Sequence, residues 1–423
     1  MDWKLTFSVS VLILTYVFMI WEKMPRVVTA LLGASSLIVC HVITQKQAFE
    51  AIDFNVIALL FGMMILINIL SHTGLLTCIA IWSAKSTNGN PTKLLLAFGT
   101  LSGFLSAFLD NVTTILLLGS ITCVITRKLK LNPVPFLISE AICSNVGGTA
   151  TLIGDPPNIM IGSAANLDFY AFLTNLSPFI LIIFPVILST LLLIYRNGFQ
   201  LSEDAAKELA TLSATDAIRD RPLMIKALSV IALVIVGFIF HGSLNLEAGT
   251  IAVSGASLLL IFENRKDVWN DVEWTTIFFF IGLYVIVGAV EATGALEMVA
   301  KDLLTLVGNH SPLAISVMLL WLSALCSAVI DNIPYTATVI PIVESIQSTD
   351  MNTTLWWALS LGACLGGNGS LIGATANVVA ADIAHTNGEK ISFAEFSFVG
   401  IIITLETLIF STIFLYLKHR GFI

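Results

Sequence analysis

The stretch GGTATLIGDPPN, at Gly147–Asn158, recurs as GGNGSLIGATAN at Gly366–Asn377, about 220 residues further along the chain. Both copies carry a glycine pair, a Leu-Ile-Gly step and a closing asparagine. Three shorter matches keep nearly the same spacing: Gly33–Ser35 with Gly255–Ser257, Asp53 and Thr73-Gly74 with Glu273 and Thr293-Gly294, and Asp110-Asn111 with Asp331-Asn332. Four matches in the same order indicate an internal duplication, because chance does not keep order and spacing together.

The composition of the chain is that of a membrane protein. Its 423 residues are 57% hydrophobic and 11% charged, with a mean hydropathy of +0.92. Ordinary soluble domains have about 25% charged residues, so water is excluded as the main solvent of this chain. Several apolar runs reach the ~20 residues that a helix needs to cross the hydrocarbon core. We therefore expect an all-α polytopic protein that crosses the plasma membrane many times, with the lipid bilayer as a partner.

Each half is expected to contain about five transmembrane helices, one re-entrant hairpin and one broken helix. The hairpins are predicted at Thr92–Thr126 and Ser311–Ser348. Residues 1–196 would form the first repeat, residues 197–222 a polar linker, and residues 223–423 the second repeat. An odd number of crossings per half makes the second repeat inverted and puts most Lys and Arg residues on the linker's side. By the positive-inside rule that side, linker included, is cytoplasmic and both termini face outward.

Several partners and chemistries are not expected. The net charge of −8 comes from short loops and from acids within apolar segments, so it predicts no nucleic-acid partner. The six cysteines lie apart without a CxxC pair, which argues against a disulfide framework or a zinc site. The sequence lacks a phosphate-binding P-loop motif, so the chain is not expected to hydrolyse ATP, although a separate ATPase subunit could associate with it. We expect no cofactor and no metal site, apart from a proton or Na⁺ as coupling ion.

The two glycine-rich stretches predict the binding site of a transporter. A half-helix is expected from Pro133 to about Asn145, with Gly147-Gly148 non-helical, and a second break is expected at Gly366-Gly367. Non-helical backbone at membrane depth is tolerated only inside protein or around a water-filled cavity. Paired breaks in two repeats are typical of solute and ion sites, since half-helix ends bind ions there. The alternative is a pair of packing kinks, where small residues let helices approach closely.

Two further motifs, FLDNVTT at Phe108–Thr114 and VIDNIPYT at Val329–Thr336, place Asp-Asn within apolar stretches. A carboxylate there is expensive unless it is paired, hydrated or protonated. At a hairpin tip, each aspartate could cap the returning helix while the following asparagine turns its amide to the centre. The alternative is that these residues are helix caps and nothing more.

Asp155 breaks the symmetry of the duplication, because its counterpart is Ala374. A single ionisable group at mid-membrane is suited to carry a proton or to bind Na⁺, so we expect Asp155 to bind the coupling ion. The alternative is a capping role for the half-helix that begins with Pro156 and Pro157.

These motifs together predict one central substrate and ion site. Its candidate residues are Asp110, Asn111, Thr113, Thr114, Gly147, Gly148, Thr149, Thr151, Asp155, Asn158, Asp331, Asn332, Thr336, Gly366, Gly367, Asn368, Ser370, Thr375 and Asn377.

FLDNVTT followed by SNVGGTATLIGDPPNIMIG, with a second Asp-Asn motif and a second glycine-rich break, resembles the arsenite permease and sodium–proton antiporter family of the ion-transporter superfamily. The GDPPN stretch is most similar to the P-protein-like branch. The resemblance covers almost the whole chain. It implies an elevator-type or rocking transporter with a scaffold domain, a transport domain that carries both hairpins, and a homodimer.

The leading hypothesis for function is efflux of arsenite or antimonite, a small inorganic solute, coupled to protons or to the membrane potential by alternating access. Related dicarboxylate carriers have Ser-Asn-Thr at the hairpin tips, whereas this chain has Asp-Asn. Each close pair of like charges costs ~4 kcal/mol at an effective dielectric of 20, which disfavours a divalent anion. The alternatives within transport are Na⁺/H⁺ antiport and an anion transporter or channel. An intramembrane aspartyl protease is a different class that leaves the glycine-rich breaks unexplained, so the chain is not expected to be an enzyme.

Overall fold

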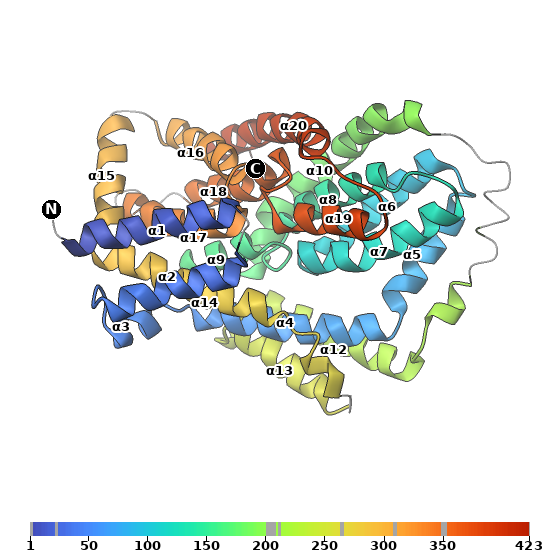
Figure 1. Ribbon diagram of the computed structural model, residues 1–423, viewed down its shortest axis with the longest axis horizontal. Helices are drawn as coiled ribbons and strands as arrows, with labels where there is room; N and C mark the ends of the chain where they lie inside the picture. The colour runs from blue at the N-terminus through green and yellow to red at the C-terminus, as the bar shows by residue number, and fades with distance from the viewer. Residues whose placement is uncertain are drawn as a thin grey trace.

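The computed structural model describes residues 3–21, 24–199, 209, 213–262, 266–307, 311–347 and 353–422, and these form helices and connecting turns without a strand (Figure 1). The first half contains α1 Trp3–Trp21, α2 Arg26–Val39, α3 Gln45–Glu50, α4 Phe54–His72, α5 Leu75–Ser86, α6 Pro91–Ser106, α7 Asn111–Lys128, α8 Val134–Gly148, α9 Pro156–Ala164, α10 Phe169–Tyr195 and η1 Arg196–Gly198. The rest contains η2 Thr215–Ala217, α12 Arg221–Leu244, α13 Ala248–Leu260, η3 Lys266–Trp269, α14 Trp274–Ala292, α15 Ala295–Val307, α16 Pro312–Ser327, α17 Asn332–Gln347, α18 Thr354–Gly366, η4 Gly367–Gly369, α19 Thr375–Thr386 and α20 Phe393–His419.

Six of the described helices are long and apolar enough to cross a membrane: α1, α4 and α10, and their counterparts α12, α14 and α20. The starts of the last pair are fixed by matching caps. The Asp168 carboxylate accepts a hydrogen bond from the backbone N–H of Ala171 at 2.6 Å, and the Ser392 hydroxyl accepts one from Glu395 at 3.1 Å. Such caps accept hydrogen bonds from the first backbone N–H groups of a helix, which have no partner within the helix and could find none in lipid. Both helices then run for 27 residues.

The duplication is visible in the order and in the packing of the helices. The helices from α1 to α10 and those from α12 to α20 follow the same order. In each half a long helix leads to a short connecting helix, then to the two helices of a hairpin, and then to the two helices on either side of a break. Contacts are reciprocal: α4 packs on α13 as α14 packs on α2, and α7 packs on α19 as α17 packs on α9. In Figure 1 the α6–α7 hairpin lies to the right, the α16–α17 hairpin to the left, and their tips approach each other between them. This is the arrangement of two inverted repeats, so the expected fold class is confirmed.

The helices form two bundles. We call α1–α4 with α12–α14 the scaffold bundle, and α6–α10 with α16–α20 the hairpin bundle, because most helix contacts fall within one set or the other. α5 connects α4 to the first hairpin, and α15 connects α14 to the second. Residues 200–208 and 210–212 of the expected linker lie outside the described part of the chain, and the repeat boundaries stay a prediction.

The glycine pairs are helical, contrary to expectation. α8 continues through Gly147 and Gly148, and α18 ends at Gly366, with Gly367 in a short 3₁₀ turn. The physical reason is close packing. A Cβ on Gly147 would overlap the backbone of Gly103 in α6, and one on Gly366 would overlap the backbone of Ala324 in α16. The breaks follow these pairs, at residues 149–155 and 370–374.

Candidate functional site

Each hairpin tip is shaped by an aspartate that caps the returning helix. Asp110 accepts hydrogen bonds from the backbone N–H and the hydroxyl of Thr113, at 2.9 and 2.5 Å. Asp331 accepts one from the backbone N–H of Ile333 at 3.1 Å. The expected capping geometry is present at both tips. As a result the next residue in each hairpin, an asparagine, directs its side chain to the centre of the hairpin bundle.

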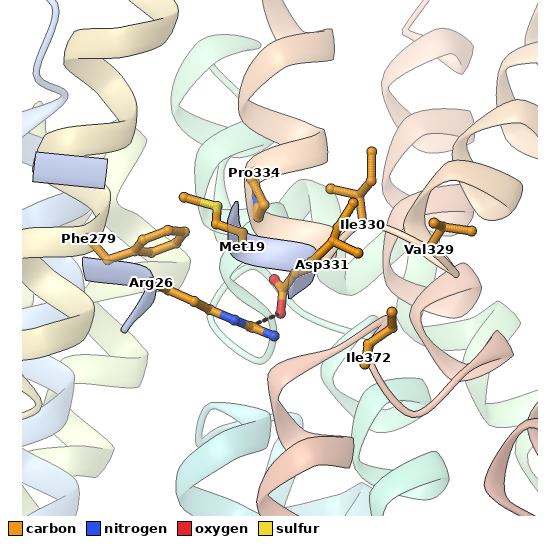
Figure 2. Close-up of a pocket in the computed structure, with 9 residues that line it drawn as sticks. Met19, Arg26, Phe279, Val329, Ile330, Asp331, Pro334 and Ile372 are labelled. Atoms are coloured by element: carbon orange, nitrogen blue, oxygen red, sulfur yellow. Dashed lines mark hydrogen bonds and ion pairs between the residues drawn. The ribbon is translucent and has the colours of Figure 1, made fainter. Parts of the chain in front are cut away.

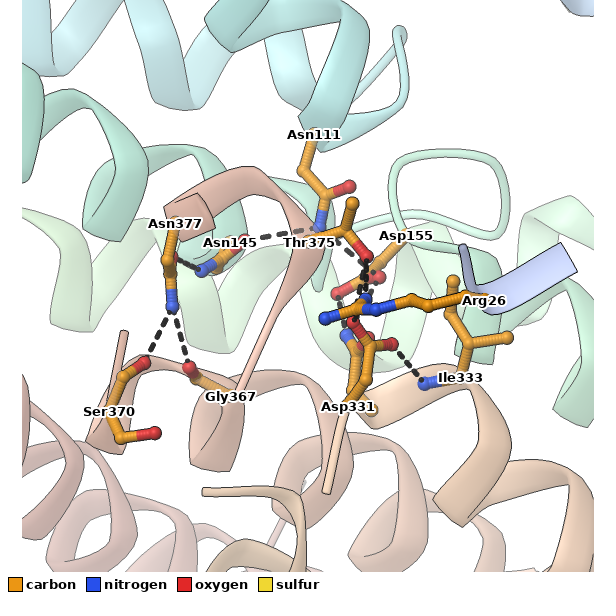
Figure 3. A network of polar contacts seen from close by, with 11 residues as sticks. Arg26, Asn111, Asn145, Asp155, Asp331, Ile333, Gly367, Ser370, Thr375 and Asn377 are labelled. Atoms are coloured by element: carbon orange, nitrogen blue, oxygen red, sulfur yellow. Dashed lines mark hydrogen bonds and ion pairs between the residues drawn. The ribbon is translucent and has the colours of Figure 1, made fainter. Parts of the chain in front are cut away.

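The asparagines of both hairpins converge on Asp155. Nδ2 of Asn332 lies 3.1 and 3.3 Å from the two carboxylate oxygens of Asp155, and Nδ2 of Asn111 lies 3.4 Å from Oδ1. All three side chains are buried, with Asp155 at 0% exposure. The arrangement solvates one carboxylate with amide N–H groups from two repeats (Figure 3).

Asp155 does not cap α9, although it occupies the N-cap position. Pro156 and Pro157 follow it and have no backbone N–H to donate. The first available donor, the N–H of Asn158, bonds to the backbone oxygen of Asp155 at 2.9 Å instead of its side chain. The capping alternative for this side chain is therefore wrong, and its carboxylate faces the hairpin tips.

A chain of asparagines extends from this carboxylate to the second break. Asn111 also donates to Oδ1 of Asn145 at 3.0 Å, and Asn145 donates to Asn368 and Asn377 at 2.8 and 2.9 Å. The sequence predicts Asn145 only as the end of a half-helix. The signal that could have found it is an amide two residues before the glycine pair, on a helix buried on every side.

Asn158 and Asn377 hold the backbone of the breaks. Asn158 donates to the carbonyl oxygens of Thr149 and Thr151, and Asn377 to those of Gly367 and Ser370, at 2.9–3.2 Å. The chain is not α-helical in the breaks, so these carbonyl oxygens need hydrogen-bond donors from side chains, and the two equivalent asparagines supply them.

Two more predicted residues tie the breaks to the hairpins. The hydroxyl of Thr151 donates to the Ala107 carbonyl, and that of Ser370 to the Ala328 carbonyl. Thr149 bonds within its own helix, to the Asn145 oxygen. These three hydroxyls therefore have structural partners.

Several buried polar atoms at the centre have no hydrogen-bond partner among the described residues. They include the hydroxyls of Thr114 and Thr336, on the two returning hairpin helices, and Nδ2 of Asn368. Buried polar atoms are nearly always satisfied, so the missing partners of these three groups single them out within the described part of the chain.

Arg26, which sequence analysis missed, adds a positive charge. Its Nη1 lies 2.6 Å from Oδ2 of Asp331, and Thr375 donates to the same oxygen at 2.7 Å. Arg26 follows Pro25 and is the first residue of α2. Nothing in the neighbouring sequence indicates that it pairs with Asp331, which lies 305 residues further along the chain. The structure thus assembles three aspartates and one arginine around the hairpin tips.

The profile of the family described as "Citrate transporter", CitMHS, matches residues 16–362. The chain belongs to this family. It is 38% identical over 422 residues to a "46 kDa membrane protein" of Mycobacterium leprae, with 97% of this chain and 98% of the relative covered. It is 33% identical to the P protein of Homo sapiens, covering 94% of this chain and 58% of that protein.

A solved structure, the YdaH transporter of Alcanivorax borkumensis, shares the fold with a TM-score of 0.56 and 12% identity, covering 86% of this chain and 85% of that one. This CitMHS protein is therefore a multi-pass membrane transporter and not an enzyme. The similarity to the P protein is confirmed by these matches. The finer assignment to the arsenite permease and sodium–proton antiporter family is not.

Proposed function

We propose that this protein is a secondary active transporter in which Asp155 binds the coupling ion, and in which the solute carries no net negative charge. The observation that carries the proposal is the contact of one buried carboxylate with an asparagine from each hairpin. A group held by both repeats is placed to respond when either hairpin moves, as alternating access requires.

The amide groups suit a carboxylate that changes its charge. A primary amide has a donor and an acceptor on one planar group. With the N–H groups directed at Asp155, as here, the ionised form is solvated. After rotation of one amide, its oxygen accepts a hydrogen bond from the protonated acid. The same pocket can therefore hold Asp155 in both forms without leaving a bare charge in low dielectric.

The charges around the hairpin tips favour a neutral solute. Three carboxylates, Asp110, Asp155 and Asp331, lie at or next to the hairpin tips, and of these Arg26 pairs with Asp331, so a free anion meets repulsion of ~4 kcal/mol for each close pair with an unpaired carboxylate at an effective dielectric of 20. Arsenite and antimonite are neutral trihydroxides, and the unpartnered groups of Thr114, Thr336 and Asn368 can hydrogen-bond to hydroxyls. Efflux of these metalloids, driven by protons or by the membrane potential acting on the coupling ion, is our leading assignment.

Two other substrates are retained as alternatives. Exchange of Na⁺ for H⁺ needs only Asp155, since one carboxylate can bind either ion in turn. Citrate, named in the family description, would meet weaker repulsion when it is carried as a complex with a divalent metal, because the metal neutralises two of its three negative charges. A homodimer, which the resemblance implies, and a separate ATPase subunit are further proposals.

The assignment can be tested with the purified protein in proteoliposomes that contain a pH-sensitive dye. Arsenite, antimonite, Na⁺, Li⁺, and citrate with and without Mg²⁺ are added in turn at a fixed pH gradient. We expect proton movement and solute uptake with the metalloids, and neither in protein-free liposomes. A response to citrate alone would contradict the charge argument, and a response to Na⁺ without metalloid transport would replace the leading substrate by the first alternative.

A further inference from the structure

The scaffold bundle places one cation against the second hairpin. Nη1 of Arg26, in the first turn of α2, lies 2.6 Å from Oδ2 of Asp331 and 3.0 Å from Oγ1 of Thr375. Asp331 is the tip of the second hairpin, and Thr375 begins α19, so both acceptors belong to the hairpin bundle. The ion pair therefore crosses the boundary between the bundles (Figure 3).

A second polar contact crosses the same boundary nearby. The hydroxyl of Tyr16, in α1, donates to the carbonyl oxygen of Pro334 at 2.6 Å and also shares a hydrogen bond with Thr338. Both partners lie on α17, within two turns of Asp331. The second hairpin is thus tied to the scaffold bundle from α1 and from α2.

The first hairpin has no matching ion pair in the described part of the chain. Asp110 bonds to Thr113 on its own helix. The residue equivalent to Arg26, at the start of α13, is Ala248. Because the two repeats share one fold, this difference shows that the fold itself does not require a cation at that place.

The ion pair also lines a small pocket near the Asp155 site. Arg26 and Asp331 line a pocket with Met19, Phe279 and Ile372 (Figure 2). Its volume is about 10 Å³, which is room for about one water. Asn332, the residue after Asp331, contacts Asp155 directly. The pocket therefore lies one residue along the chain from a group that holds the Asp155 carboxylate.

We propose that Arg26 is a gating residue, whose ion pair with Asp331 closes this side of the site and opens when the hairpin bundle moves relative to the scaffold bundle. The inference rests on the alternating access of the proposed function. Arg26 has two properties that a gate needs: it belongs to the other bundle, and its side chain is 25% exposed, so other side chains do not enclose it fully.

The experiment measures the closure of the pocket directly. Ile372→Cys places a thiol in the pocket wall, and its rate of modification by a small uncharged maleimide is followed by mass spectrometry in proteoliposomes. Native Cys326 on α16 is the internal reference. Arg26→Gln should raise the rate at position 372 several-fold, and Arg26→Lys, which keeps the charge, should restore slow modification. Asp331→Asn, which keeps an oxygen for the Ile333 cap, should act like Arg26→Gln.

The control is Lys46→Gln, which removes the exposed Lys46–Glu50 pair within α3 and should leave the rate unchanged. An unchanged rate in both Arg26→Gln and Asp331→Asn would overturn the gate. So would an equal rise in Lys46→Gln, since that would show general loosening. The assay needs no transported solute, so failure of the substrate assignment and failure of the gate are seen separately.

Discussion

Nδ2 of Asn332 lies 3.1 Å from Oδ1 of Asp155, so the second hairpin solvates a carboxylate that belongs to the break of the first repeat. Asn111, from the first hairpin, donates to the same oxygen at 3.4 Å. The equivalent place in the second repeat holds Ala374. The two matched halves therefore direct both hairpins at one carboxylate. The break of the second repeat adds no second ionisable group at the equivalent position.

Replacing either hairpin asparagine should abolish transport while the protein remains in the membrane. In Asn111→Ala or Asn332→Ala, the Asp155 carboxylate loses a hydrogen bond of the kind that is worth about 1.5–3 kcal/mol when one partner is charged, and in the proposed function this carboxylate takes up and releases the coupling ion. We expect transport to fall more than about tenfold, with abundance close to that of the unaltered protein. Asn175→Ala, on α10 and away from the centre, is the matched control. Disappearance of either variant from the membrane at normal synthesis would make that asparagine structural.

Asn158 and Asn377 should behave differently from the hairpin asparagines. Each donates two hydrogen bonds to carbonyl groups of a break, and an unsatisfied buried carbonyl costs about 1–3 kcal/mol. Asn158→Ala and Asn377→Ala are therefore expected to lower the thermal unfolding midpoint in detergent and the membrane abundance together. Normal stability combined with lost transport would assign these residues to the solute instead.

Much of the fold could be predicted from the sequence because its signals are local and repeated. The Asp-Asn tip, the hairpin and the glycine-rich break each occur twice, and lipid restricts the backbone to helices. The capping by Asp110 and Asp331 was predictable for the same reason, since a cap is formed with the next few residues.

The long-range contacts of the site could not be predicted in this way. Arg26 meets Asp331 across 305 residues, and Asn145 meets Asn377 across 232. Such pairs depend on how the bundles dock, which no local pattern reports. The glycine pairs were misjudged because glycine can end a helix or let two helices touch, and only the neighbouring backbone of Gly103 decides between these roles.

The packing role of the glycine pair can be tested through stability. Gly147→Ala would drive a methyl group into the backbone of Gly103, and overpacking of this kind costs about 1–3 kcal/mol. We expect a lower unfolding midpoint in detergent. Gly198→Ala is the control, because a Cβ at Gly198 meets nothing within 4 Å. Equal midpoints for the two variants would show that α6 and α8 can separate at no cost.

The last prediction concerns Asp155 as the residue that binds the coupling ion. Asp155→Asn keeps the size of the side chain and leaves an oxygen that accepts hydrogen bonds from Asn111 and Asn332, but it cannot take up or release a proton. The variant should therefore fold, bind the solute and exchange it between equal concentrations on both sides. It should lose net uphill transport, and with it the dependence of transport on pH or Na⁺.

The measurement that decides this compares uphill uptake and solute exchange in the same proteoliposomes over a range of pH. Under the proposed coupling, the carboxylate of the unaltered protein is neutralised each time the site changes sides, since a bare charge in low dielectric costs several kcal/mol. Its uphill rate therefore follows the pH gradient, whereas exchange in Asp155→Asn should not. A purely structural role predicts unchanged uphill transport and an unchanged pH profile, because the amide replaces the carboxylate as an acceptor. That outcome would remove Asp155 from the coupling step and leave Asp110 and Asp331 as the remaining carboxylates at the hairpin tips.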